Sequence, residues 1–103
     1  MFSVIRRYNV REGMSQQVAD RVNAEFLPLL REMRGFVSYA LINPGDGTLM
    51  SISVFSDRGG ADESTRAASE WVREHVARMV ANSPVILSGE VCAYAGGTSA
   101  VAS

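Results

Sequence analysis

Cysteine is almost absent from this chain, since Cys92 is the only one. A single thiol cannot close an intrachain disulfide or assemble a thiolate metal cluster, so neither is expected to hold the fold together. A reducing compartment fits this usage, and we expect a cytoplasmic location. Cys92 lies in a strand-like run without basic neighbours, which favours an inert structural thiol over a nucleophile.

Charge of one sign and long apolar runs are also lacking. Ten basic residues, all arginines, nearly balance eleven acidic ones, and the formal net charge is -1. Neither sign forms a run longer than Arg6-Arg7, which disfavours nucleic acid as a partner. The apolar stretches are far shorter than the roughly 20 residues of a membrane-spanning helix. Without lysine, the glycine pairs of the chain do not make a phosphate-binding loop. We therefore expect a soluble protein that binds neither membrane nor nucleic acid.

Histidine is represented by His75 alone. With Glu70 or Glu74 it gives too few ligands for a metal site, so we predict no metal and no cofactor. The helical spacing places His75 on the same stripe as Val72 and Met79, facing inward. An imidazole there is a candidate catalytic base with a pKa near neutral pH. The alternative is a core histidine that hydrogen-bonds a strand carbonyl or a serine.

What the chain does have is ordinary globular composition over 103 residues, with 47% hydrophobic and 20% charged residues. This predicts one domain, residues 1–95, followed by a disordered small-residue tail, residues 96–103. Alternating patterns predict strands at residues 2–9, 36–43, 48–56 and 85–94. Helical spacing predicts helices at residues 15–33, interrupted by Pro28, and 59–82. This order predicts an α+β, ferredoxin-like βαββαβ fold in which both helices cover one face of a four-stranded antiparallel sheet.

The hairpin between the second and third strands decides which side chains share a face. A four-residue loop, Pro44 to Gly47, pairs Ser38 with Ser53 and Ala40 with Ser51. One face then has a centre of small, mostly hydroxylated side chains, whereas a loop one residue longer would mix the two sets. The other face is uniformly large and apolar, with Val37, Tyr39, Leu41, Met50, Ile52 and Val54.

Both predicted faces carry apolar area, but the helices can cover only one of them. At about 25 cal/mol per Å², a few hundred Å² of bare apolar sheet is worth several kcal/mol. We therefore expect a two-fold homodimer whose sheets pack face to face. The alternative is a monomer with a mixed outer face.

Several segments of the chain resemble one known family. They are Arg34 to Tyr39, the turn Gly45 to Thr48, the strand end Val54 to Asp57, and the helix around Trp71. Over about residues 2–94 they are similar to the antibiotic biosynthesis monooxygenase-like family of dimeric α/β barrels. The resemblance implies a cofactor-independent oxygenase, in which a small aromatic polyphenol reacts with dioxygen in a cavity between sheet and helices.

The chain departs from that family at the positions linked to its chemistry. Such oxygenases carry an asparagine and a tryptophan four residues apart on the third strand, where this chain has Ser51 and Phe55. Serine lacks the amide and phenylalanine lacks the indole donor. A haem-degrading branch of the family uses a helical histidine with an asparagine and a tryptophan, but the spacing of Asn9, Trp71 and His75 does not match it. Haem binding or degradation through His75 therefore ranks as the last alternative.

These observations leave an enzyme and a non-catalytic module open. A small-side-chain centre beneath a helix favours a pocket for a small aromatic ligand. The non-catalytic alternative is a small-molecule-binding or regulatory dimer, and an interior without a void larger than one or two waters would favour it. Trp71 is either a pocket wall or ordinary core or dimer packing. The candidate pocket residues are Ser38, Ser51, Ser53, Phe55, Trp71 and His75.

Overall fold

The computed structural model describes residues 1–97. Residues 98–103 of the predicted tail lie outside the described residues, and residues 96–97 belong to no helix or strand. The elements follow the predicted order, and their bounds are β1 Phe2–Asn9, α1 Ser15–Arg21, η1 Val22–Phe26, α2 Leu27–Arg31, β2 Phe36–Ile42, β3 Thr48–Phe55, α3 Arg58–His75 and β4 Val85–Glu90.

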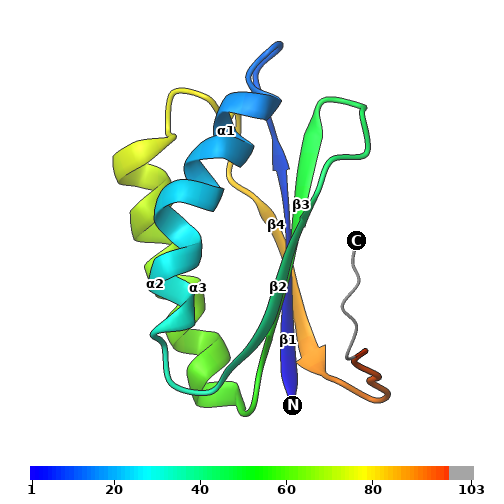
Figure 1. Ribbon diagram of the computed structural model, residues 1–103. Helices are drawn as coiled ribbons and strands as arrows, with labels where there is room; N and C mark the ends of the chain where they lie inside the picture. Colours follow the sequence, from blue (N-terminus) through cyan, green and yellow to red (C-terminus); the bar gives the residue numbers. More distant parts are fainter. Residues whose placement is uncertain (98–103) are drawn as a thin grey trace.

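The four strands form one antiparallel sheet in the order β2-β3-β1-β4. The helices all lie on one face of this sheet, and the opposite face carries no helix (Figure 1). This is the ferredoxin-like α+β arrangement that the element order predicted. Among residues 1–97, no helix is long and apolar enough to cross a membrane.

The first helical segment is broken at Pro28, as predicted, but by a wider turn and not by a simple kink. The residues of η1 form a π-helical turn, and Pro28 sits in the first turn of α2, where its missing N–H is tolerated. The wider turn keeps residues four apart on one face, so Val18, Val22 and Phe26 are followed by buried Leu30. Regular helical spacing from Val18, Val22 and Phe26 would instead place Leu29 on the buried face, but Leu29 is 52% exposed.

Helix α3 begins with a side-chain cap and ends earlier than predicted. The Asp57 carboxylate accepts a hydrogen bond from the Gly60 N–H at 2.9 Å. The helix ends at His75 and not at residue 82, because Val76 leaves the helical conformation and is buried in the core. The chain then turns back, and Val80 forms a bridge with Val10 at the end of β1.

The predicted hairpin register was wrong by one residue. Phe36 does pair with Phe55, but a bulge at residue 37 shifts the rest of β2, so that Tyr39 pairs with Ser53 and Leu41 with Ser51. Large side chains of β2 therefore lie opposite small ones of β3 on the helix-facing side. This alternation fills space more evenly than the predicted pairing of large with large.

The outer face of the sheet has an apolar centre after this correction, and the exposed Arg7 lies on the same face. Ile52 lies at its centre, opposite Ile5 and Ala40, and Leu87 lies on the edge strand β4. Exposure is high for Leu87, at 64%, and for Ile42, at 42%. Strand β4 is also shorter than predicted and ends at Glu90.

Candidate functional site

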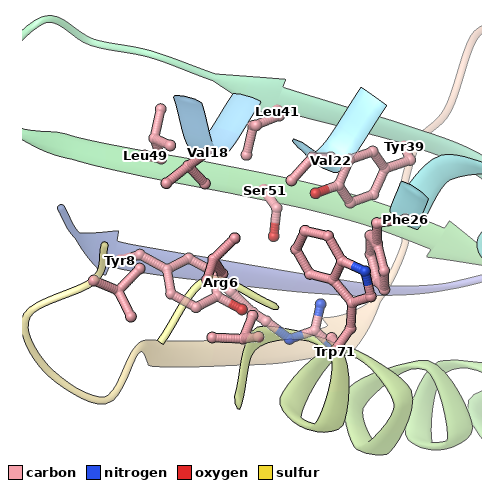
Figure 2. A pocket seen from close by; sticks show the side chains of 14 residues that line it. Arg6, Tyr8, Val18, Val22, Phe26, Tyr39, Leu41, Leu49, Ser51 and Trp71 are labelled. Carbon is pink, nitrogen blue, oxygen red and sulfur yellow. The ribbon is translucent and has the colours of Figure 1, made fainter. Parts of the chain in front are cut away.

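A cavity lies between the sheet and the helices. Side chains reach it from β1, β2 and β3 on one side and from the helical layer, including Trp71 of α3, on the other (Figure 2). Its free volume is about 30 Å³, and gaps that open to solvent bring the total to about 450 Å³. The smaller value corresponds to one or two water molecules. The lining residues are Arg6, Tyr8, Val18, Val22, Phe26, Tyr39, Leu41, Leu49, Ser51, Ala68, Trp71, Val72, Val76 and Val80.

Arg6 places a guanidinium group inside this lining. It lies on β1, an interior strand, and the residue is only 3% exposed. Its Nη2 donates a hydrogen bond to Oγ1 of Thr65 at 2.8 Å. Its Nε is buried without a hydrogen-bond partner among the described residues. Burial lowers the pKa of Arg6, and the neighbouring Tyr8 and Tyr39 oppose that shift.

Two tyrosines stand near Arg6 in the lining. Burial raises the pKa of Tyr39 to about 12, and the neighbouring Tyr8 raises it further, while Ser51 and Arg6 oppose the shift. Burial also raises the pKa of Tyr8, against the influence of Arg6. Both phenols are therefore neutral at pH 7 and can donate or accept hydrogen bonds. Neither of them neutralises Arg6.

Trp71 forms the aromatic wall on the helix side. It is 5% exposed, and its ring lies 5.3 Å from that of Phe26, between centroids. Its Nε1 is buried without a hydrogen-bond partner in residues 1–97. The buried face of α3 contains Ala68 and Trp71, whereas His75, which the helical spacing predicted to face inward, is only partly buried.

His75 stands outside the cavity lining and does not face inward. It is the last residue of α3, and its ring stacks on Trp71 at 5.3 Å between centroids and 10° between planes. The His75 side chain is 31% exposed, and its Nδ1 lies 4.0 Å from Oε1 of Glu25. That nitrogen has no hydrogen-bond partner among the described residues. The imidazole is thus close to the rim of the site through Trp71.

The structure brings together two of the six predicted pocket residues, Ser51 and Trp71, in the cavity lining. Ser53 is buried on the same face but donates its hydroxyl to the Val4 carbonyl at 3.3 Å. Phe55 is fully buried and packs edge-on against Phe36. These two hold the core together beside the cavity.

Ser38 lies on the other side of the sheet from Ser51. It pairs with Val54, whereas Ser51 shares the helix-facing side with Arg6. The bulge at residue 37 causes this separation, because it reverses the alternation of side chains along β2.

Sequence reasoning missed Arg6, Tyr8 and Tyr39 as lining residues. The alternation in β1 carried a signal for the first two, since Val4, Arg6 and Tyr8 are spaced by two and so share one face. Tyr39 had no such signal, because its orientation depends on the bulge. Within residues 1–97 no group of three or more His, Cys, Asp or Glu side chains gathers where it could hold a metal ion.

Comparisons with solved structures find the same fold in several proteins. A protein of unknown function from Nitrosomonas europaea is 21% identical, with a TM-score of 0.78 over 95% of each chain. A monooxygenase encoded by ActVA-Orf6 of Streptomyces coelicolor, solved in complex with nanaomycin D, is 13% identical, with a TM-score of 0.74 over 94% of this chain and 92% of that one. SnoaB, a cofactor-independent oxygenase from Streptomyces nogalater, is 12% identical, with a TM-score of 0.69 over 90% and 94%.

At these identities the structural matches show a shared fold. No curated protein matches the chain. The sequence profile described as antibiotic biosynthesis monooxygenase matches residues 1–81, which is well over half of the 103 residues. The chain therefore belongs to the antibiotic biosynthesis monooxygenase family.

Proposed function

We propose that the cavity between sheet and helices binds a small aromatic molecule, and that the protein oxygenates this molecule with dioxygen without a cofactor. The observation that carries the proposal is the lining itself. Aromatic rings of Trp71, Phe26 and Tyr39 meet there with two buried donors, Arg6 Nε and Trp71 Nε1, that have no hydrogen-bond partner within residues 1–97. Apolar walls with a few convergent polar groups are typical of small-molecule sites, and unpaired buried donors call for an acceptor on the ligand.

The reaction we propose is that of an anthrone-type methylene. The carbon loses its two hydrogens, one oxygen atom of O₂ becomes the new carbonyl, and the other leaves as water with those hydrogens. The carbon is oxidised by four electrons and O₂ is reduced by four. In this scheme the protein positions the ring between Trp71 and the sheet, donates hydrogen bonds to its oxygen and excludes bulk water.

The ligand must displace side chains to enter. A free volume of about 30 Å³ does not hold a ring system, and most of the total of about 450 Å³ consists of gaps between side chains and space open to solvent. Trp71 lines the cavity and the partly exposed His75 stacks on it, so a change in the side-chain conformation of this pair would be one way to open the cavity. We therefore propose that ligand entry separates this stacked pair from the sheet.

A homodimer is the second part of the proposal. Apolar residues on the uncovered face, among them Ile52, Ile42 and Leu87, would be removed from water if two sheets packed face to face. Ile52→Asp at the centre of this face should then give a monomer in sedimentation analysis. Leu29→Asp is the control. It alters a residue that is 52% exposed on the helical side, and the sedimenting species should keep the mass of a dimer. A monomeric unsubstituted protein would contradict the proposal.

Oxygen uptake tests the activity. The protein is incubated with anthrone-type and quinol substrates, and O₂ consumption is compared with the appearance of quinone absorbance. We expect one O₂ per quinone formed from the anthrone. Trp71→Phe should lower the rate by removing the indole donor, and His75→Ala tests the imidazole at the rim. If the unsubstituted protein and the His75→Ala variant both consume no O₂ with any of these substrates, the proposed oxygenase activity is wrong.

The small cavity also favours a second candidate, a non-catalytic binding or regulatory dimer. A protein that does not bind a substrate in its interior is expected to have a closely packed core, and this interior has room for only one or two water molecules. Ser51 and Phe55, at the two positions where oxygenases of this family carry asparagine and tryptophan, point the same way. Quenching of Trp71 fluorescence by an aromatic ligand without oxygen uptake would favour this candidate over the oxygenase.

A further inference from the structure

The Arg6 guanidinium is a buried cation that forms no ion pair with any of residues 1–97. The residue is 3% exposed, and its side chain makes one hydrogen bond within the described residues, to the neutral hydroxyl of Thr65. A guanidinium has five N–H donors, so most of its capacity is unused. Taking an ion out of water costs several kcal/mol unless a partner of opposite charge compensates it. The unliganded protein leaves that compensation incomplete.

A carboxylate of the cavity does not supply that compensation. Among residues 1–97, those that line the cavity include no aspartate or glutamate. The nearest ionisable groups with acidic protons are the phenols of Tyr8 and Tyr39, which burial keeps neutral at pH 7. Glu25, at the rim, forms an ion pair with Arg21 at 2.9 Å. The counter-charge for Arg6 must therefore come from outside the described part of the chain.

The sheet register places a second polar group next to Arg6. Ser51 lies directly opposite it on the neighbouring strand β3, on the same helix-facing side. In Figure 2 the Ser51 hydroxyl points into the space toward Arg6 and Trp71. A hydroxyl can donate a hydrogen bond to an oxyanion that the guanidinium holds. The two groups together form a polar spot in an otherwise apolar and aromatic lining.

We propose that Arg6, assisted by Ser51, is a specificity-determining subsite for an oxyanion on the ligand, so that the protein selects aromatic acids over neutral aromatics of the same shape. This rests on the proposed function, since it assumes that the cavity receives an aromatic ring. The shared chemistry is an oxyanion attached to the ring system, and either a carboxylate or a phenolate supplies it. Charge-assisted hydrogen bonds of this kind are roughly twice as strong as neutral ones.

The test uses three small probes with one ring each: 4-nitrobenzoate, 4-nitrophenol and nitrobenzene. Affinities are measured by calorimetry or by quenching of Trp71. We expect the unsubstituted protein to bind at least one of the two anions about tenfold or more tightly than nitrobenzene. The two anion arms separate a carboxylate subsite from a phenolate one. Bound nitrophenol should also show its phenolate absorbance at lower pH than free nitrophenol.

An arginine on the helical side provides the matched comparison. Arg6→Gln should abolish the preference for anions and the shift in nitrophenol titration, with a much smaller effect on nitrobenzene binding. Arg6→Lys should keep part of the preference, because it keeps the charge but loses the planar fork. Arg31→Gln makes the same change of charge at an exposed position of α2, away from the cavity and from the uncovered sheet face, and should change nothing. Circular dichroism establishes that each variant is folded.

The outcomes separate this inference from the proposed function. Equal affinity for anions and nitrobenzene would overturn the oxyanion subsite and leave the aromatic site intact. An anion preference that Arg31→Gln also removes would overturn it as well, since the effect would then be one of overall charge. Failure to bind any probe would remove the aromatic site and the subsite together. An anion preference lost only in the Arg6 variants would support both.

Discussion

Replacing Arg6 by methionine should make the unliganded protein more stable, although the change removes a hydrogen bond. Methionine keeps much of the length of the side chain and carries no charge. The substitution relieves the desolvation of a guanidinium in a residue that is 3% exposed. It removes the hydrogen bond to Thr65, but the Thr65 hydroxyl keeps its own donated bond to the Ala61 carbonyl at 3.1 Å. The substitution therefore leaves no additional donor without a hydrogen-bond partner.

The magnitude follows from two opposing terms. Burial of an uncompensated ion costs several kcal/mol, whereas a hydrogen bond from a charged group contributes about 1.5–3 kcal/mol. The cavity beside Arg6 has room for one or two waters, which would solvate the cation and reduce the first term. We therefore expect a net gain of about 1 kcal/mol. For a domain of this size that raises Tm by about 5 °C.

Thermal unfolding followed by circular dichroism at one fixed protein concentration measures this change. Arg31→Met, at an exposed position of α2, is the control, since exposed substitutions away from special features usually change stability by less than about 0.5 kcal/mol. A saturating aromatic acid should raise the Tm of the unsubstituted protein but not that of the Arg6→Met variant. If Arg6→Met lowered Tm by several degrees while Arg31→Met did not, Arg6 would have a compensating partner and the reasoning would fail.

Three further predictions concern the core and the cavity. Gly60→Ala should lower the free energy of unfolding in urea by about 1–3 kcal/mol, because the new Cβ would lie 2.9 Å from a backbone oxygen. Gly59→Ala should be neutral or stabilising, because the nearest atom to a Cβ at that position is 3.6 Å away. Equal effects of the two substitutions would contradict this. Burial raises the pKa of Tyr39 from 10.0 to about 12, so the folded state keeps this proton at pH values where the unfolded state loses it. The contribution of Tyr39 to the unfolding free energy should therefore be constant well below pH 10 and fall by about 2 kcal/mol toward pH 12. Tyr39→Phe should make the fall measured over this range shallower. Trp71→Ala should lower the free energy of unfolding in urea by about 3–5 kcal/mol. Trp71→Phe should lower it clearly less, since phenylalanine keeps an aromatic ring and removes the Nε1 donor that has no partner within residues 1–97. Similar losses in the two variants would refute this.

Much of the fold could be predicted because it depends on local patterns. The alternation in residues 2–9 and the break at Pro28 are properties of short segments, and the structure confirms both. The end of α3 could not be predicted in this way. Residues 76–82 continue a helical spacing, but burial of Val76 and the bridge from Val80 to β1 are tertiary interactions that override it.

The candidate site was harder to predict because it combines side chains from strands whose register is not local. Ser51 and Trp71 were predicted from spacing, and both line the cavity. In the sequence, Arg6 stands out only as half of the pair Arg6-Arg7, although its alternation with Val4 predicts that it shares the buried face. Its importance depends on the absence of a nearby carboxylate, and only the three-dimensional arrangement reveals that.

The bulge at residue 37 suggests how such a cavity can change during evolution. Strand β2 is at the edge of the sheet and pairs with β3 alone, so it can shift without disturbing other strands. A change of one residue in the length of the loop after β2 would exchange its two faces. Ser38 and Ala40 would then replace Tyr39 and Leu41 beside the helices. One insertion or deletion in an exposed loop would thus enlarge the cavity and remove the Tyr39 phenol from its lining, without any substitution among the residues of the strands.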